Sequence, residues 1–246
     1  MKKTVVLAGL SLLATGAFAQ TNLQVFYDFG KNRKMVTTTL EMFKSDNWGN
    51  TFFFVDYDYA SKDMRDANVY GATGSYMELA RCFNFWSDSK LAPLSLQVEF
   101  NGGIGFGNRN WLFGLDYFLH SADFSNTLNL KVLYKTFCNG AESEVPLQFT
   151  AVWGMDNLFG LEGLRFSGFA DFWGETTSYW YGAGQENPLA EAGKWIFLSE
   201  PQLWYNIGRH FGCENFNIGG EVELSYNFAG CSGFYCRPCL GTKWNF

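Results

Sequence analysis

Once its first residues are set aside, the sequence contains no apolar run long enough to form a transmembrane helix. Such a helix needs about 20 consecutive apolar residues, so a helical membrane protein is excluded. The chain also has only 5 prolines and 2 histidines, and its 18 Lys and Arg residues face 24 Asp and Glu residues. Without a basic cluster it has no electrostatic surface for nucleic acid, and we expect no nucleic-acid partner.

Aromatic residues and glycine are abundant instead. Phe, Tyr and Trp make up 19% of the chain, and there are 27 glycines. The mean hydropathy of −0.11 alone would suggest a soluble protein. Aromatic enrichment with alternating polarity is, however, typical of a transmembrane β-barrel, whose polar lumen side offsets its lipid side in any average. We therefore expect an all-β protein.

The first 19 residues are typical of a secretory signal peptide. Lysines at positions 2 and 3 precede an apolar stretch over residues 4–16, and Ala-Phe-Ala at residues 17–19 forms a cleavage site. The predicted mature chain is one domain over residues 20–246. Loss of the two lysines leaves 16 basic against 24 acidic residues, a formal charge of −8.

Polar and apolar residues alternate in segments that are long for a soluble protein. In residues 94–101 the Leu, Leu, Val and Phe side chains share one face of a strand, and polar side chains occupy the other. A tilted membrane-crossing strand takes about 9–11 residues. The pattern predicts twelve strands, at residues 23–29, 35–45, 51–60, 75–86, 94–104, 110–120, 126–137, 146–155, 163–174, 194–206, 216–228 and 238–246. It indicates a closed antiparallel transmembrane β-barrel of about 12 strands.

The connections and the C-terminus favour the same architecture. Compact turns alternate with longer connections, which such barrels place on the periplasmic and outer sides respectively. The longest predicted outer loop covers residues 175–193, and residues 229–237 form the last one. The final strand ends on Phe246, which resembles the insertion signal of bacterial outer-membrane barrels. We expect an integral outer-membrane protein whose partners are lipid and the barrel-assembly machinery; a secreted soluble barrel or sandwich is the alternative.

Several segments resemble the nucleoside-specific channel-forming (Tsx-like) family of outer-membrane proteins. The matching stretches are residues 38–43 (Thr-Thr-Leu-Glu-Met-Phe) through Trp48 to residues 52–56, residues 76–79 with Phe83, residues 166–174, and the closing aromatic strand. The resemblance implies a twelve-stranded barrel with a narrow lumen. It also implies that aromatic and ionisable side chains in this lumen bind nucleosides.

Charged residues fall almost entirely on the polar face of the predicted strands. Arg or Lys on the lipid face at mid-bilayer costs about 2–4 kcal/mol, so this sorting predicts lumen-facing side chains. The acidic ones are Asp28, Glu41, Asp56, Asp58, Glu78, Glu99, Asp116, Asp171, Glu200, Glu221 and Glu223, and the basic ones are Lys131, Lys135, Arg165 and Lys243. Such an acidic field favours cations and neutral solutes over anions. Arg81 is the exception, because alternation points it towards lipid; a nearby bulge or snorkelling to the interface would explain it.

Aromatic side chains share the predicted lumen face. Phe52, Phe54, Phe169 and Trp173 alternate inward, and rings beside carboxylates suit a planar base with a sugar attached. Barrels of 8 strands are filled by side chains and those of 16–18 are open, so twelve strands predict a constricted passage. The predicted function is an outer-membrane channel for small polar solutes, with nucleosides suggested by the resemblance. The alternatives are a lumen plugged by paired acids and bases, a receptor that binds a ligand through its outer loops, and a lipid-acting enzyme.

No other motif predicts a different chemistry. His120 and His210 fall in or beside predicted periplasmic turns, and no Gly-x-Ser-x-Gly motif occurs, so we nominate no catalytic residue and no cofactor. Three of the six cysteines cluster in residues 231–239, where Cys231 and Cys236 could form a local disulfide or remain free thiols. The spacing fits no standard zinc motif. Residues 102–107 are glycine-rich, but no helix follows to make a phosphate site.

Overall fold

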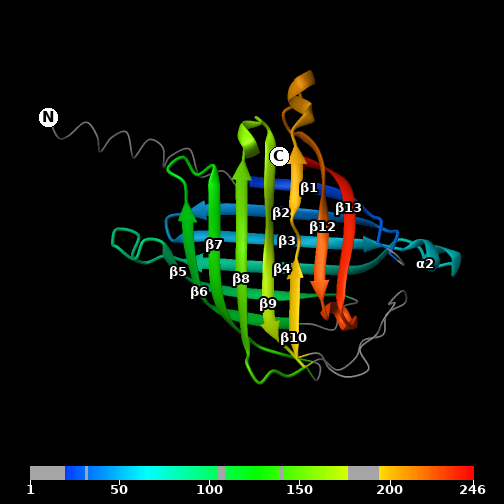
Figure 1. Ribbon diagram of the computed structural model, residues 1–246, viewed down its shortest axis with the longest axis horizontal. Helices are drawn as coiled ribbons and strands as arrows, with labels where there is room; N and C mark the ends of the chain where they lie inside the picture. Colours follow the sequence, from blue (N-terminus) through cyan, green and yellow to red (C-terminus); the bar gives the residue numbers. More distant parts are fainter. Residues whose placement is uncertain (1–19, 31–32, 105–108, 139–140, 177–193) are drawn as a thin grey trace.

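The computed structural model describes residues 20–30, 33–104, 109–138, 141–176 and 194–246. Within them one antiparallel sheet closes on itself (Figure 1). Its strands are β1 (Gln20–Asp28), β2 (Val36–Asp46), β3 (Gly49–Tyr59), β4 (Ala72–Phe83), β5 (Leu94–Ile104), β6 (Arg109–His120), β7 (Asn126–Lys135), β8 (Leu147–Asp156), β9 (Leu164–Gly174), β10 (Trp195–Ser199), β11 (Gln202–Tyr205), β12 (Phe216–Tyr226) and β13 (Phe234–Asn245). The connections carry α2 (Lys62–Asp66), η1 (Leu158–Gly160), η2 (Ile207–Phe211) and η3 (Phe228–Gly230). Among the described residues, no helix has the length and apolar character needed to cross a membrane.

The sheet forms a ring because its first and last strands pair. Leu23 of β1 lies opposite Trp244 of β13, and each strand from β1 to β9 pairs with its neighbour in the sequence. β10 and β11 lie end to end between β9 and β12, as two halves of one crossing. The barrel therefore has twelve crossings, which confirms the predicted fold class.

Pro201 divides the tenth crossing, which the sequence predicts as one strand over residues 194–206. Proline has no N–H to donate to a sheet, so the strand pairing breaks there. The Pro201 carbonyl still accepts from Val222 N at 3.0 Å. Opposite it, Gly168 has a φ of +153°, and a Cβ at this position would lie 2.5 Å from the carbonyl oxygen of Glu200. Glycine is needed here because the two backbones approach too closely for a side chain.

Most predicted strand bounds differ from the observed ones by a few residues, and two of these differences change the connections. The predicted strand over residues 75–86 ends at Phe83, because Asn84 N instead donates to the carbonyl of Trp48 in the adjoining turn. The predicted outer loop over residues 229–237 is shorter, because β13 begins at Phe234. The turn before it is closed by Gly233 N, which donates to Asn227 Oδ1 at 2.9 Å. Residues 234–237 therefore lie in the barrel wall.

The two faces of the sheet are chemically opposite. Along β6, every second side chain is apolar and between 41% and 48% exposed: Trp111, Phe113, Leu115, Tyr117 and Leu119. Asn110 and Asp116 alternate with them and are buried inside the ring. An outer surface of this composition is stable against lipid rather than water.

Arg81 lies on the outer face of β4, as the alternation predicts. The described part of β4 has its register shift opposite Asp58 and Tyr59, far from Arg81, so no bulge accounts for it. Its Nη1 and Nη2 instead donate to the two carboxylate oxygens of Asp46, at 2.7 and 2.9 Å. Asp46 is the last residue of β2, so the guanidinium reaches the rim of the barrel and snorkels to the interface.

The lipid-facing assignment predicts a cost that depends on depth. Leu115→Arg places a charge at the middle of β6 and should lower the free energy of unfolding by about 2–4 kcal/mol. Leu119→Arg is the matched control on the same face near the strand end, and should cost about 0–1 kcal/mol. Urea titration of the protein refolded in lipid vesicles, followed by tryptophan fluorescence, measures both. Equal losses at the two positions would contradict the assignment.

Candidate functional site

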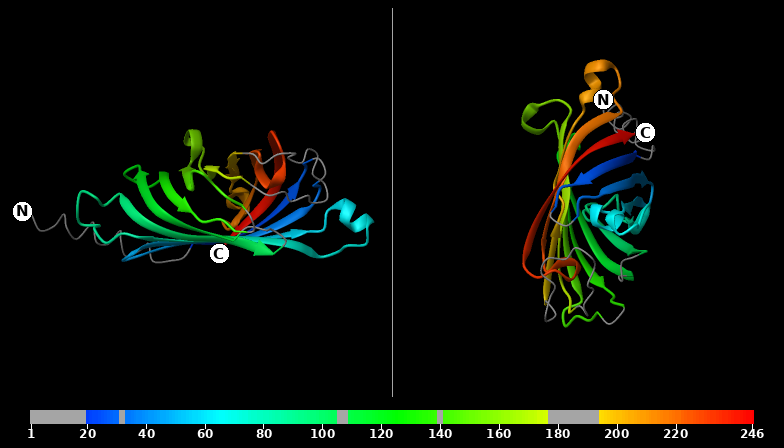
Figure 2. Two further views of the ribbon diagram at one scale, coloured as in Figure 1. Left: turned by 90° about the horizontal axis from the view of Figure 1, so that it is seen from below. Right: turned by 90° about the vertical axis from the view of Figure 1, so that its right-hand side faces the viewer.

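The inside of the barrel contains one continuous cavity of 1420 Å³. Figure 2 shows the curvature of the strands that form the ring. At the end where β1 begins and β13 ends, the lining of the cavity includes Asn84 and Thr127. At the opposite end, where α2 lies, it includes Ser61 and Glu175. The cavity thus extends from one rim of the barrel to the other.

The structure places all the predicted lumen residues but one along this cavity. The acidic ones are Asp28, Glu41, Asp56, Asp58, Glu78, Asp116, Asp171, Glu200, Glu221 and Glu223; the others are Lys131, Lys135, Arg165, Lys243, Phe52, Phe54, Phe169 and Trp173. Glu99 is the exception. It points inward but is 6% exposed and accepts a hydrogen bond from Gln97 Nε2 at 2.6 Å, so its carboxylate belongs to the wall.

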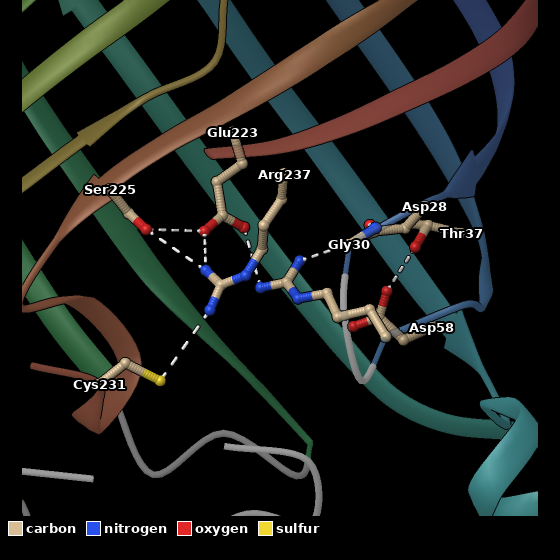
Figure 3. Close-up of polar contacts among 9 residues, drawn as sticks. Asp28, Gly30, Thr37, Asp58, Glu223, Ser225, Cys231 and Arg237 are labelled. Carbon is tan, nitrogen blue, oxygen red and sulfur yellow. Dashed lines mark hydrogen bonds and ion pairs between the residues drawn. The ribbon is translucent and has the colours of Figure 1, made fainter. Parts of the chain in front are cut away.

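An ion-pair network occupies the cavity towards the end where α2 lies (Figure 3). Glu223 on β12 accepts from Arg237, its direct cross-strand partner on β13, and its Oε2 lies 2.9 Å from Arg33 Nη2. Arg33 also pairs with Asp28, with 3.2 Å between Nη1 and Oδ2. Ser225 Oγ donates to Glu223 at 3.0 Å. Glu223 therefore joins the connection between β1 and β2 to the β12–β13 hairpin.

This network remains negatively charged overall. Asp58, held by Thr37 Oγ1 at 2.7 Å, faces the same space, so three carboxylates meet two guanidinium groups. Arg33 lies in the connection between strands and is 30% exposed. Burial alone would lower the pKa of Arg33, but the carboxylates of Glu223 and Asp28 outweigh that effect and raise it, so the guanidinium stays charged.

The sequence did not identify Arg33 and Arg237 as lumen residues. Both fell in predicted outer loops, whereas the structure puts Arg237 in β13 and folds Arg33 into the cavity. The available signal was the turn sequence Asn227-Phe-Ala-Gly230, which allows a short connection. A short turn brings residue 237 opposite Glu223, and opposite charges pair favourably across strands.

Other acids along the cavity have no ion pair within the described residues. Thr39 Oγ1 donates to Asp56 at 2.5 Å, Tyr76 OH donates to Glu78 at 2.8 Å, and Gln202 Nε2 donates to Glu221 at 2.7 Å. Asp171 accepts from Thr150, and the Glu200 carboxylate makes no hydrogen bond in the described part. The acids of the lumen are therefore not neutralised by the bases around them.

Two lysines of the lumen contact aromatic rings. Lys135 Nζ lies 3.8 Å from the ring centre of Trp173, and Lys243 Nζ lies 4.5 Å from that of Trp204. Arg165 is different, because it pairs with Asp156 near the rim that carries the chain termini. Cation–π contacts hold these ammonium groups against the wall.

Aromatic side chains form a ladder on one wall. The ring centres of Phe52 and Phe54 on β3 are 6.1 Å apart, and Phe54 and Tyr76 on β4 are 6.0 Å apart. Phe169 lines the cavity from β9. Rings and carboxylates thus share the same stretch of the lumen.

Histidines and cysteines form no centre in the described part of the chain. His120 Nδ1 lies 2.7 Å from the Ser121 carbonyl oxygen, and His210 Nε2 lies 2.5 Å from the Tyr205 hydroxyl. Each of the six cysteines is a free thiol, which is one of the two alternatives that the sequence left open for the cluster at residues 231–239. No group of His, Cys, Asp and Glu side chains among these residues could hold a metal ion.

A closed ring of tilted strands with an apolar outside and a polar interior defines an integral outer-membrane β-barrel. The sequence matches, over residues 19–246, the family described as a domain of unknown function (DUF5020), and the chain belongs to this family. No curated protein has a matching sequence.

Solved structures share the fold. The NanC porin is 8% identical, with 92% of this chain and 100% of that chain covered and a TM-score of 0.53. Outer membrane phospholipase A from Escherichia coli is 11% identical, with 93% and 97% covered and a TM-score of 0.52. The Salmonella typhi phospholipase dimer with bound calcium is 11% identical, with 92% and 90% covered and a TM-score of 0.52. A porin and an enzyme thus have this architecture, and the fold alone does not define the activity.

The ion-pair network predicts unequal roles for two neighbouring glutamates. Glu223→Gln leaves two guanidinium groups short of a charged partner and should lower the free energy of unfolding by about 1–3 kcal/mol. Glu221→Gln is the matched control, two residues away on the same face and without an ion pair, and should cost roughly 1 kcal/mol or less. Urea unfolding in vesicles compares them. A Glu221 variant that is the less stable of the two would contradict the network.

Proposed function

We propose that this barrel is a channel through which small polar solutes diffuse across the outer membrane. The observation that carries the proposal is the cavity inside the barrel, whose lining includes residues of both rims. A barrel of twelve crossings lies in size between barrels of 8 strands, which side chains fill, and barrels of 16–18 strands, which hold an open aqueous channel. A passage of this intermediate width suits small solutes. The ion-pair network of Glu223, Arg33 and Arg237 narrows it further at one end.

We propose that the channel prefers cations and neutral solutes to anions. Asp56, Glu78, Asp171, Glu200 and Glu221 line the cavity without an ion pair in the described part. Field lines from such carboxylates are focused in a narrow lumen with low-dielectric walls, which raises the local concentration of cations. Even the ion-pair network has more carboxylates than guanidinium groups.

Nucleosides are the solutes we propose within that class. The ring faces of Phe52, Phe54 and Tyr76 offer a stacking surface for a planar base. Carboxylates of Glu41, Glu78 and Asp56 in the adjoining positions could accept hydrogen bonds from amino groups and hydroxyls of base and sugar. The resemblance to the Tsx-like family supports the same solute class.

Single-channel recording tests the channel directly. The mature protein, refolded in a planar bilayer, should give small conductance steps, and adenosine or thymidine on one side should reduce the current at modest concentration. Heat-modifiable gel mobility confirms that the inserted protein is folded. A folded barrel without conductance would favour a plugged receptor or a lipid-acting enzyme, and phospholipid hydrolysis by that sample would identify the latter.

Ion selectivity tests the role of the acids that lack an ion pair. Glu200→Gln combined with Glu221→Gln should lower the potassium-to-chloride permeability ratio by at least about twofold, because both carboxylates face the passage. Glu214→Gln is the matched control, since Glu214 is an exposed turn residue outside the cavity. Reversal potentials in a salt gradient measure the ratio. An unchanged ratio in a folded double variant would place the ion path elsewhere.

A further inference from the structure

One ring of the aromatic ladder lies between two carboxylates. Glu41 on β2 and Glu78 on β4 are the direct cross-strand partners of Phe54 on β3. Directly opposed side chains on one face of a sheet are neighbours, with Cβ atoms about 4.5–5.5 Å apart. All three line the cavity, and Phe52 continues the aromatic surface at a ring distance of 6.1 Å from Phe54. This group, Phe52, Phe54, Glu41 and Glu78, is called the Phe54 site below.

The two carboxylates of the Phe54 site are not bound to a base in the described part of the chain. Glu41 accepts from Asn22 Nδ2 at 2.8 Å, and Glu78 accepts from Tyr76 OH at 2.8 Å. A carboxylate has room for about four hydrogen bonds, so these neutral donors leave acceptor capacity at both. Two carboxyl side chains with free acceptor positions therefore flank an aromatic face that lines the lumen.

A buried amide next to the site also lacks a partner. Asn101 on β5 is the direct cross-strand neighbour of Glu78 and lines the cavity. It is 4% exposed, and its Oδ1 has no hydrogen-bond donor in the described structure. A buried polar group without a partner is rare and requires a reason. A hydrogen-bond donor of a solute bound at Glu78 would therefore lie close to the Asn101 side chain.

Other aromatic rings inside the barrel are each covered by a basic side chain. Trp173 is covered by Lys135, Trp204 by Lys243 and Tyr235 by Arg237, at 3.8, 4.5 and 4.5 Å from ring centre to cation. Within the described residues, no Lys or Arg of the chain covers Phe52 or Phe54. The Phe54 site thus offers aromatic rings, as these ring–cation contacts do. It differs from them because two carboxylates flank the ring and no Lys or Arg of the described residues covers it.

We propose that the Phe54 site binds small organic ammonium ions as they pass through the lumen. The ring faces attract the positive charge and its methyl or methylene groups, and the two carboxylates neutralise it. An inorganic metal ion is the poorer ligand, because no cluster of three metal ligands occurs among the described residues. Organic ammonium ions are a solute class within the proposed channel. Binding at the Phe54 site rests on the proposed function only because solutes must be able to reach the lumen.

Binding of choline tests this site separately from transport. Titration calorimetry on the full mature protein, refolded in a maltoside detergent that lacks an ammonium group, should give saturable binding. The probe 3,3-dimethylbutan-1-ol has the same shape without the charge and should bind at least about tenfold more weakly. Equal binding of the two compounds, or no binding of choline, would overturn the proposal.

Variants locate the site. Phe54→Leu keeps an apolar side chain but removes the ring, and should weaken choline binding roughly three- to thirtyfold. Phe54→Tyr keeps a ring and should bind nearly as the wild type does, which separates loss of the ring from a defect in folding. Glu78→Gln should also weaken binding. Phe118→Leu is the matched control, because Phe118 lines the cavity on β6 and its direct cross-strand partner on β7 is the neutral Asn129.

The outcomes for site and channel are distinguishable. Choline binding that Phe54→Leu weakens, in a barrel that conducts no ions, would retain the site and reject the channel. Conductance with no difference between choline and its neutral analogue would retain the channel and reject the site. Equal weakening by Phe118→Leu and Phe54→Leu would place the ammonium ion elsewhere and reject the site.

Discussion

Every backbone N–H and C=O group of the membrane-spanning strands must be paired within the sheet, because the lipid around it offers no donor or acceptor. That constraint requires β1 to pair with β13 and leaves the described ring without a free edge. It also explains the tenth crossing. Pro201 cannot donate to the sheet, yet its carbonyl pairs with Val222 N, and Gly168 lets the opposite backbone come close. The ring thus tolerates a proline where an open sheet would place one at an edge.

A closed single-layer wall leaves only two environments for side chains, lipid outside and the lumen inside. Charges are costly in lipid, so nearly all of them point into the cavity or lie at a rim. Arg81 illustrates the second solution, because it faces outward but reaches Asp46 at the end of β2. The acidic and basic side chains of the interior are therefore a direct result of the fold, and the selectivity that we propose arises from how they are paired.

Alternation in the sequence was enough to predict the twelve crossings and the inward side chains, because each strand has the same two solvents along its length. Alternation could not predict which side chains contact one another inside the lumen. Arg33 lies in a connection that folds back inside, and Arg237 depends on a turn of seven residues, from Asn227 to Gly233, that the strand pattern does not define. Glu99 faces inward as predicted, yet Gln97 beside it on the same strand covers it. Such contacts depend on side-chain packing and not on periodicity.

The pairing of the lumen acids follows from the register of the sheet. Glu223 is opposite Arg237 and is paired, whereas Glu221, two residues away, has Cys239 and Gln202 as its cross-strand neighbours. Asp56 lies between Thr39 and Tyr76, Glu78 between Phe54 and Asn101, and Asp171 between Thr150 and Leu198. None of these neighbours carries a base, so none of them can neutralise the acid that it faces. A partner of opposite charge at Cys239 or Asn101 would have done so. The residues that face each other across the strands therefore determine which acids of the middle lumen lack a direct partner of opposite charge.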